Sequence, residues 1–411
     1  MNPSPRARRF ERVAVRPCVL IRWLVVRFAR TALVGLLVGS VACGLVFSPG
    51  DYGDSPAPEP EADTGVTTLD VAPSGDTGPT DASLPSTRIM LFAGRRDALP
   101  GEPSGVNVAE TMRTTLSPSG ELGPWTFDVP PSQMTTWTRG LLAGESLLLQ
   151  STSAFLATTF ADGHISGAWR ALPPPGAPES YLRAWLVSDA RLTAAGGQAG
   201  GLFTTNVYVA SFDLADGGIE PWQKATSKLV TARGDVTLLR HGDHLYAVGG
   251  RESTSSLAPG SDEVEVARFG ADGSLGDFAA TTKLADPSAD AASFGVLLPV
   301  VTAGAGHVFV LGGQTTPSTT SLSDVALAAK IDAASGNLGP WVALPKLPAP
   351  MSGAAALVVD DKVLVFGGSL GSSQSEDVLA LSIGPNGSFD TAWKKIGTLP
   401  GPRSGLAAVV Y

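Results

Sequence analysis

Residues Lys362–Ser369 read Lys-Val-Leu-Val-Phe-Gly-Gly-Ser, and this stretch decides the fold because versions of it recur along the chain. Each version is a short apolar run that ends in a glycine pair, or in Ala-Gly in the first copy. The copies are Arg88–Arg95, Ser146–Ser153 (degenerate, with Ser151-Thr152 in place of the glycines), Arg191–Gln198, His244–Arg251 and His307–Gln314.

A second periodic signal follows each glycine pair. Ser119–Trp125 and Ser335–Trp341 share a glycine turn followed by Gly-Pro-Trp, and weaker copies end at Trp169, Trp222, Phe278 and Trp393. The spacings between these aromatic residues are 44, 53, 56, 63 and 52. A self-similar period near 50 residues is typical of a propeller or a solenoid. It also explains how about 325 residues can form one domain.

One period contains four short strands. In the unit that begins at Ser352, three apolar runs are separated by turn residues, and a polar run follows the strong turn signal Asn386-Gly387. Four short antiparallel strands, apolar inside and polar at the edge, predict a propeller blade. The expected strands are Ala354–Val359, Lys362–Phe366, Asp377–Ile383 and Trp393–Ile396.

The two ends of the repeat region complete each other. Ser404–Tyr411 aligns with a first strand that has no second strand after it, whereas Arg88–Gly94 is a second strand that has no first strand before it. Pairing Leu406–Val410 with Arg88–Phe92 would close a ring of six blades.

These features resemble the Kelch repeat: a hydrophobic run, the glycine pair, a polar loop, a third strand and a following tryptophan. Arg403-Ser404-Gly405 before the last apolar run resembles the start of another unit. The resemblance covers nearly all of residues 87–411. It implies an all-β fold, a six-bladed Kelch-like β-propeller with four antiparallel strands per blade, closed by the terminal strands.

The N-terminal region reads as an export signal, which we assign to residues 1–43. Eight arginines precede Thr31, the apolar run Thr31–Ala42 is too short to span a bilayer, and small residues lead to Cys43. Ser40-Val-Ala-Cys-Gly44 resembles the lipobox of bacterial lipoproteins, in which the cysteine is lipidated and becomes the first residue; Ser40 stands where leucine is usual. The alternatives are an ordinary secretory signal and an uncleaved anchor that begins near Val19.

Residues 44–86 read as a disordered acidic tether. The segment is rich in Pro, Gly, Ser and Thr, and Asp51–Asp81 holds eight acidic residues and no basic one. It lacks the apolar surface that would offset the entropy of ordering. The cysteines, Cys18 and Cys43, both precede the propeller, which therefore contains no disulfide.

Several residue patterns are assigned to structure rather than to chemistry. The histidines His164, His241, His244 and His307 fall in turns or at strand starts, where we expect them to be solvated, and no metal site is expected. The repeated tryptophans hold equivalent positions in their blades, which favours a structural role over carbohydrate stacking. We expect no catalytic residue and no cofactor, and galactose-oxidase chemistry is excluded because no cysteine follows Cys43.

Candidate binding residues gather by topology on the side of the glycine-pair loops. Loops on a rigid scaffold commonly carry binding groups, and several guanidinium groups at one channel mouth could hold a carboxylate or a phosphate; structural pairing of these arginines with nearby acids is the alternative. The candidates are Arg95, Arg139, Arg183, Arg233, Arg251, Arg403, Trp137 and Trp185.

The net charge excludes one class of function, and the resemblance to Kelch proteins leaves two. The net charge of −9 argues against non-specific nucleic-acid binding. We expect an exported monomer, anchored through lipid on Cys43 and facing the periplasm or the cell exterior, that binds an envelope protein or an acidic glycan. The alternative is an enzyme that acts on a sugar acid, similar to the Kelch-like sialic-acid mutarotases; a deep site with converging Arg and acid or His would favour it.

Overall fold

The protein is described here by a computed structural model that covers residues 86–92, 94–97, 106–131, 139–150, 155–172, 185–188, 190–213, 218–255, 257–288, 294–318 and 321–411. All of these residues belong to one compact unit, Pro79–Tyr411. The Cys43 prediction and the predicted tether lie outside the described residues, apart from residue 86. Within the described ranges no helix is long and apolar enough to cross a membrane.

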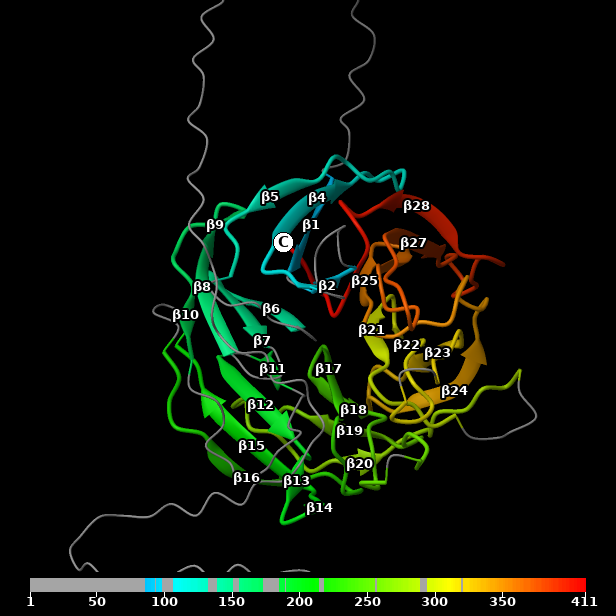
Figure 1. The fold of residues 1–411 in the computed structure, drawn as a ribbon. Helices are drawn as coiled ribbons and strands as arrows, with labels where there is room; N and C mark the ends of the chain where they lie inside the picture. Colours follow the sequence, from blue (N-terminus) through cyan, green and yellow to red (C-terminus); the bar gives the residue numbers. More distant parts are fainter. Residues whose placement is uncertain are drawn as a thin grey trace, which may run out of the picture. The chain divides into compact units, whose positions relative to one another are not determined.

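The described residues form a six-bladed β-propeller, as the sequence predicts (Figure 1). Each blade is an antiparallel sheet with four main strands, and its innermost strand contacts the innermost strands of both neighbouring blades, so that the contacts run around a complete ring.

The strands of the first three blades, from the innermost outward, are as follows. Blade 1 contains β30 (Ala407–Val410), β1 (Thr87–Phe92), β4 (Thr111–Leu116) and β5 (Thr126–Asp128); blade 2 contains β6 (Arg139–Ala143), β7 (Ser146–Gln150), β8 (Phe155–Ala161) and β10 (Arg170–Ala171), with β9 (His164–Ile165) also paired to β8; blade 3 contains β11 (Trp185–Ser188), β12 (Arg191–Ala195), β15 (Asn206–Ser211) and β16 (Gln223–Lys228).

The remaining three blades repeat this order without interruption. Blade 4 contains β17 (Thr237–His241), β18 (His244–Val248), β19 (Val264–Arg268) and β20 (Ala279–Ala280); blade 5 contains β21 (Val300–Gly304), β22 (His307–Leu311), β23 (Ala326–Ile331) and β24 (Leu338–Ala343); blade 6 contains β25 (Ala355–Val359), β26 (Lys362–Phe366), β27 (Asp377–Ser382) and β28 (Lys394–Thr398).

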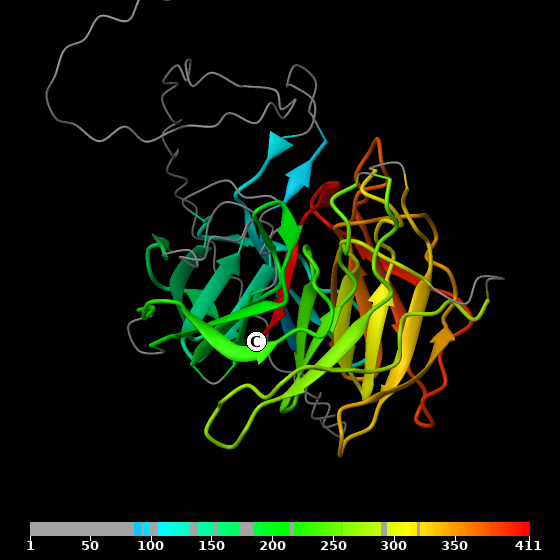
Figure 2. The same cartoon turned by 90° about the horizontal axis from the view of Figure 1, so that it is seen from below.

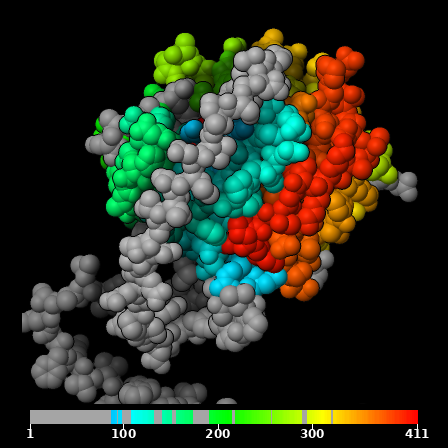
Figure 3. Space-filling view, turned by 90° about the horizontal axis from the view of Figure 1, so that it is seen from above, coloured from blue at the N-terminus to red at the C-terminus, as the bar shows by residue number. Residues whose placement is uncertain are grey.

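Blade 1 combines the two ends of the repeat region. Strand β30 pairs antiparallel with β1, in a register that places Ile89 opposite Val410 and Phe92 opposite Ala407. The cyan segments of blade 1 and the red C-terminal segments pack side by side on the surface in Figure 3. This pairing covers β30 and β1, two apolar strands that would otherwise present unpaired edges.

The two ends of each blade differ in their connections. At what we call the turn end, tight turns join the first strand to the second and the third strand to the fourth. At the opposite, loop end, longer connections follow the glycine pairs and form two small sheets of their own. One is the hairpin β13 (Gln198–Ala199) and β14 (Leu202–Phe203); the other has the order β29 (Arg403–Ser404), β2 (Arg95–Arg96) and β3 (Val106–Asn107), with β2 and β3 at the top of Figure 2.

In blades 3 to 6 the glycine pair joins the blade to the next one at the loop end. The amide of Gly368 donates to the carbonyl oxygen of Arg403 (2.7 Å), which lies just before the inner strand of blade 1. The same bond joins Gly197 to Arg233, Gly250 to Val296 and Gly313 to Met351, at 2.9, 3.1 and 2.8 Å.

The first glycine of each pair is required for two reasons. Gly249 has φ +60°, and a Cβ built on it would meet the Val296 carbonyl oxygen at 2.6 Å. At Gly196, Gly312 and Gly367 φ is also positive, and an added Cβ would overlap the equivalent carbonyl oxygen. A side chain would therefore be strained and would push the next blade away.

The repeated tryptophans join each blade to the preceding one. The indole of Trp341 donates to the Thr282 carbonyl oxygen of blade 4 (3.1 Å), and that of Trp393 to the Pro345 carbonyl oxygen of blade 5 (2.8 Å). Trp125 and Trp169 make the same backward bond. The structural role expected from the repeat therefore holds for these four residues.

The start of each second strand makes a further contact between blades, at the turn end. His244 packs against the turn of blade 5, where a Cβ on Gly336 would overlap the imidazole, and Tyr246 donates to the Gly336 carbonyl oxygen (2.7 Å). Burial, with Asp243 second, raises the pKa of Tyr246 to about 12. His244 is 4% exposed, so the expectation of a solvated residue is wrong there: the next blade covers it.

A pair of alanine substitutions in blade 4 separates backbone strain from inter-blade contact. Gly242 has φ +59°, but nothing lies within 4 Å of its added Cβ, so Gly242→Ala should cost about 1 kcal/mol through φ alone. Gly249→Ala has nearly the same φ but also meets the Val296 oxygen, so it should cost about 3 kcal/mol or more. Urea unfolding of both variants measures the difference, and equal losses would mean that the carbonyl contact contributes nothing.

Candidate functional site

The sequence-predicted binding residues do not form one exposed set. Arg95 is exposed on β2, whereas Arg233 and Arg403 are buried. Trp137 and Arg183 lie outside the described residues, and so do the side chains of Arg139, which begins β6, and Trp185, which begins β11. The structure therefore locates four of the eight predicted side chains.

Arg233 lies inside blade 4. Its side chain and that of Glu265 are both 0% exposed, and their Nη2 and Oε1 atoms are 2.9 Å apart. Nη1 donates to the carbonyl oxygens of Gly249 (2.8 Å) and Glu263 (2.7 Å). Burial lowers the pKa of Arg233, and Glu265 opposes that shift. Arg233 is therefore paired with an acidic residue inside the fold, which is the structural alternative given for these arginines.

The repeat shows what this pair replaces. Four residues before the inner strand, blade 4 has Arg233 where blades 5 and 6 have Val296 and Met351. In the third strand, Glu265 occupies the register position of Leu327 and Leu379. Blade 4 thus holds a buried ion pair where blades 5 and 6 have apolar residues.

Glu265 also accepts hydrogen bonds from two backbone amides, one of which is absent in blades 6 and 1 because those blades have proline at the equivalent position. Its carboxylate accepts the amides of Val230 (2.7 Å) and Thr231 (2.9 Å). The residues equivalent to Val230 in blades 6 and 1 are Pro348 and Pro400, which have no amide hydrogen to satisfy. The Glu265 carboxylate therefore satisfies an amide group that is present because blade 4 has valine, and not proline, at position 230.

Arg403 makes a similar but less enclosed pair in blade 1. Its Nη1 lies 2.5 Å from Oε2 of Glu110, with the two side chains 4% and 36% exposed. Its backbone is part of the β29–β2–β3 sheet and receives the Gly368 amide. As with Arg233, the guanidinium group is paired within the fold, which is the structural alternative given for these arginines.

Arg251 is held by Asp235 of its own blade and by Phe203 of blade 3. It forms an ion pair with Asp235 (2.7 Å), and its guanidinium carbon lies 5.6 Å from the centre of the Phe203 ring. Phe203 belongs to the β13–β14 hairpin of blade 3 and packs against Gly234, where an added Cβ would overlap the ring. The β13–β14 hairpin therefore packs against blade 4.

Three carboxylates gather beside Arg251 at the loop end. Ligand oxygens of Glu252, Asp262 and Glu263 lie within 4.8 Å of one another, close enough to share a cation. Lys283 contacts Asp262 (3.6 Å) and Glu263, and hydrogen bonding to Glu263 raises the pKa of Lys283. Glu252, which is exposed, accepts the Ser261 hydroxyl (2.5 Å). The ammonium group of Lys283 therefore already pairs with two of the three carboxylates.

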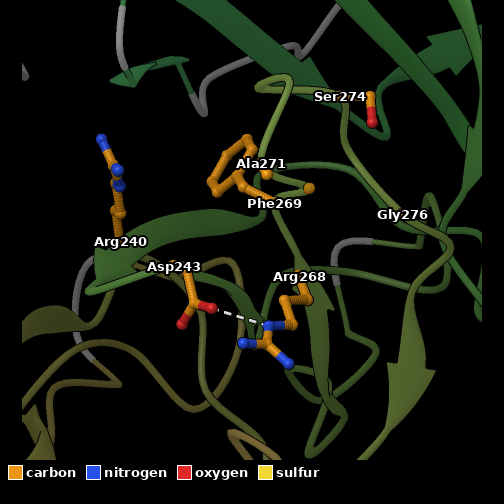
Figure 4. A pocket seen from close by; sticks show the side chains of 8 residues that line it. Arg240, Asp243, Arg268, Phe269, Ala271, Ser274 and Gly276 are labelled. Carbon is orange, nitrogen blue, oxygen red and sulfur yellow. Dashed lines mark hydrogen bonds and ion pairs between the residues drawn. The ribbon is translucent and has the colours of Figure 1, made fainter.

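Two hollows lie at the turn end. One, of about 680 Å³, is lined by Arg240, Asp243, Arg268 and Phe269 of blade 4 (Figure 4). Arg268 Nε donates to Asp243 (2.6 Å), which lowers the pKa of that carboxyl group, and the Arg240 guanidinium carbon lies 5.4 Å from the centre of the Phe269 ring. The hollow is open, and its charged groups do not converge on a shared point: Arg268 and Asp243 pair with each other, whereas Arg240 lies over Phe269.

The second hollow, of about 590 Å³, lies between blades 5 and 6. His307, Lys330 and Asp361 line it together with the turn that contains Asn386. His307 is fixed by its Nδ1, which lies 2.8 Å from the Ala305 carbonyl oxygen, and by an edge-to-face contact with Phe389. Both described hollows therefore lie away from the predicted loop-end site.

Sequence reasoning missed the most exposed apolar residues of the loop end. Leu202, next to Phe203, is 75% exposed, and Leu257, in the loop that begins at Arg251, is 86% exposed. A signal for both was present, because each leucine interrupts a stretch of glycine, serine, alanine or proline in which no core residue is expected.

Comparison with known proteins supports the fold only. No protein-family model matches the chain. A solved structure of the protein YjhT is similar, with a TM-score of 0.50 and 14% sequence identity, over 67% of this chain and 87% of YjhT. At that identity the likeness concerns architecture and carries no residue roles.

The repeat supplies a design that tests the buried pair. Arg233→Met leaves Glu265 buried without its cation, so it should cost about 3–5 kcal/mol. The triple variant Val230→Pro/Arg233→Met/Glu265→Leu copies Pro348, Met351 and Leu379 of blade 6 and should recover most of that loss. Urea unfolding measures both, with Lys346→Ala, which breaks the exposed pair to Asp324, as the control that should change little. A triple variant that is no more stable than Arg233→Met would refute the explanation.

Proposed function

We propose that this chain is an exported, lipid-anchored propeller of the Kelch type, and that it serves as a binding module at the cell envelope. The observation that carries the proposal is the division of the ring into a turn end and a loop end. Backbone bonds from the glycine pairs and indole bonds from the tryptophans hold the blades together, which leaves the loop-end connections on a rigid support.

The position of the first described strand supports this orientation. Strand β1 begins at Thr87 on the turn end, where Arg88 lies beside the turn of blade 2 that contains Gly163. A tether that precedes Thr87 would therefore join the ring at its turn end. The loop end lies at the other end of the blades and is suited to meeting a partner.

The partner surface at the loop end is broad and mixed in character. It combines the exposed Arg95 of β2 with the exposed leucines and the carboxylates of blades 3 and 4. Exposed apolar side chains rimmed by charged groups are typical of protein interaction sites. An envelope protein therefore fits this surface better than an acidic glycan.

The enzyme alternative lacks a specific observation in its favour. A sugar-acid site needs guanidinium groups that are open to the substrate carboxylate. Arg233 and Arg403, which sequence reasoning placed in that role, are held inside blades 4 and 1 by Glu265 and Glu110. We therefore carry the binding module forward as the function.

The lipid anchor has a direct test. Expression of the full chain in a bacterial host should give a membrane-bound mature protein that begins at Cys43 and carries acyl mass. Cys43→Ser should leave an unprocessed precursor or release the protein. Mass spectrometry of the N-terminal peptide decides between the outcomes, and a mature chain that begins elsewhere without acyl mass would refute the anchor.

The choice of face has a separate test in cells. A photoreactive amino acid in place of the exposed Arg95, at the loop end, should give crosslinked adducts with envelope proteins. The same amino acid in place of the exposed Ala271, in the turn-end hollow, should give few. Adducts from position 271 alone would show that the turn end is the binding face.

A further inference from the structure

Three exposed aliphatic side chains mark one sector of the loop end. Leu202, Leu257 and Val230 are 75%, 86% and 56% exposed, and we refer to them together as the blade 3–4 patch. Single exposed leucines are ordinary, but a group of them on adjoining connections marks a place where another molecule covers them.

Their contacts place these connections next to one another. Phe203, the neighbour of Leu202, lies over Arg251, which begins the loop that carries Leu257. The amide of Val230 is bound by Glu265, whose partner Arg233 also binds the Gly249 carbonyl oxygen, two residues before Arg251. All three connections thus meet around the start of one loop; in Figure 1 the β13–β14 hairpin lies beside blade 4.

The patch is held in place rather than freely suspended. The β13–β14 hairpin turns at Gly200 and Gly201, which have φ +57° and +84° and no atom close to an added Cβ. Its base is fixed because Phe203 packs on Gly234. Leu202 is therefore presented on a preorganised support, which reduces the entropic cost of binding.

The charged groups around the patch indicate the sign of the charge that a partner should carry. Glu252, Asp262 and Glu263 lie within 4.8 Å of one another, and Lys283 is the ammonium group that contacts two of them. Arg251, which is paired with Asp235, and Arg233, which is paired with Glu265, also lie close by, so five carboxylates meet three cationic groups and an excess of two negative charges remains. A carboxylate-rich rim favours a cationic group and repels an anionic one.

We propose that the blade 3–4 patch docks a protein segment that carries an apolar side chain next to a lysine or an arginine. The apolar side chain covers Leu202 and Leu257, and the cationic group joins the carboxylates around Glu252. This inference rests on the proposed binding function and names the chemistry of its partner. The sign is opposite to that of the anionic partner expected from the sequence, because two of the arginines behind that expectation lie inside the blades.

A peptide selection tests the proposal without a known partner. The full chain is immobilised and used to select from a phage-displayed library of random peptides, and the enriched peptides are synthesised and titrated by calorimetry. The enriched sequences should combine Leu, Ile or Phe with Lys or Arg. Affinity should fall about tenfold or more for Leu202→Ser/Leu257→Ser and for Glu252→Gln/Asp262→Asn.

Matched variants control for loss of apolar surface and for loss of charge. Phe127→Ser/Val129→Ser removes two exposed apolar residues, 59% and 46% exposed, from the outer edge of blade 1. Glu121→Gln/Asp277→Asn removes the same number of negative charges at exposed positions outside the patch. Both controls should bind the enriched peptides like the wild type, and melting curves should show that every variant is folded.

Each other outcome overturns the proposal. Acidic enriched peptides, the absence of any enriched peptide, equal binding by the patch variants, or loss of binding in the controls would all refute it. Crosslinked adducts from position 95 together with any of these results would preserve the proposed binding function while rejecting this patch and this partner chemistry.

Discussion

The structure depends on one close approach, which recurs after blades 3, 4, 5 and 6: a backbone carbonyl oxygen of the next blade lies where the Cβ atom of any residue other than glycine would be. Gly249 shows the constraint: positive φ and a carbonyl oxygen 2.6 Å from an added Cβ allow no other residue without strain. Gly250 then donates its amide to that same oxygen of Val296. The glycine pair is therefore a junction between blades, and the order of the ring follows from repeating it.

This junction explains why the blades can vary elsewhere. Because the bond uses backbone atoms, the side chain of the residue whose carbonyl oxygen accepts it is free to change, and it is arginine, valine or methionine in different blades. Trp341 and its equivalents act in the opposite direction along the ring, and they too bond to backbone carbonyl oxygens. Neither device depends on what a neighbouring side chain is, so a local change in one blade leaves the ring intact.

The fold was predictable because the same strand and turn patterns recur in every blade-sized segment of the sequence. The run at Lys362–Ser369 and the Gly-Pro-Trp signal are local patterns, and copies of them fix the number of blades and the strand order. The site was less predictable because topology gives the end of a blade on which a residue lies but not whether its side chain is exposed. Arg233 was placed at the right end, yet nothing near it in sequence identifies Glu265, thirty-two residues later, as its buried partner. His244 was misjudged for the same reason, since the turn that covers it belongs to the next blade.

Blade 4 combines several departures from the repeat, and they bear on the function proposed for its loop end. Blade 4 replaces an apolar pair by Arg233 and Glu265, has Val230 where blades 6 and 1 have proline, and has Phe278 in the tryptophan position. Blade 3 adds the β13–β14 hairpin, which packs against blade 4 and carries the exposed Leu202. A buried ion pair is a weak source of stability, so its place in blade 4, where blades 5 and 6 have apolar residues, calls for another reason. Local rules are usually broken where function requires it, and here the broken rules lie beneath the exposed loops that carry the proposed binding surface.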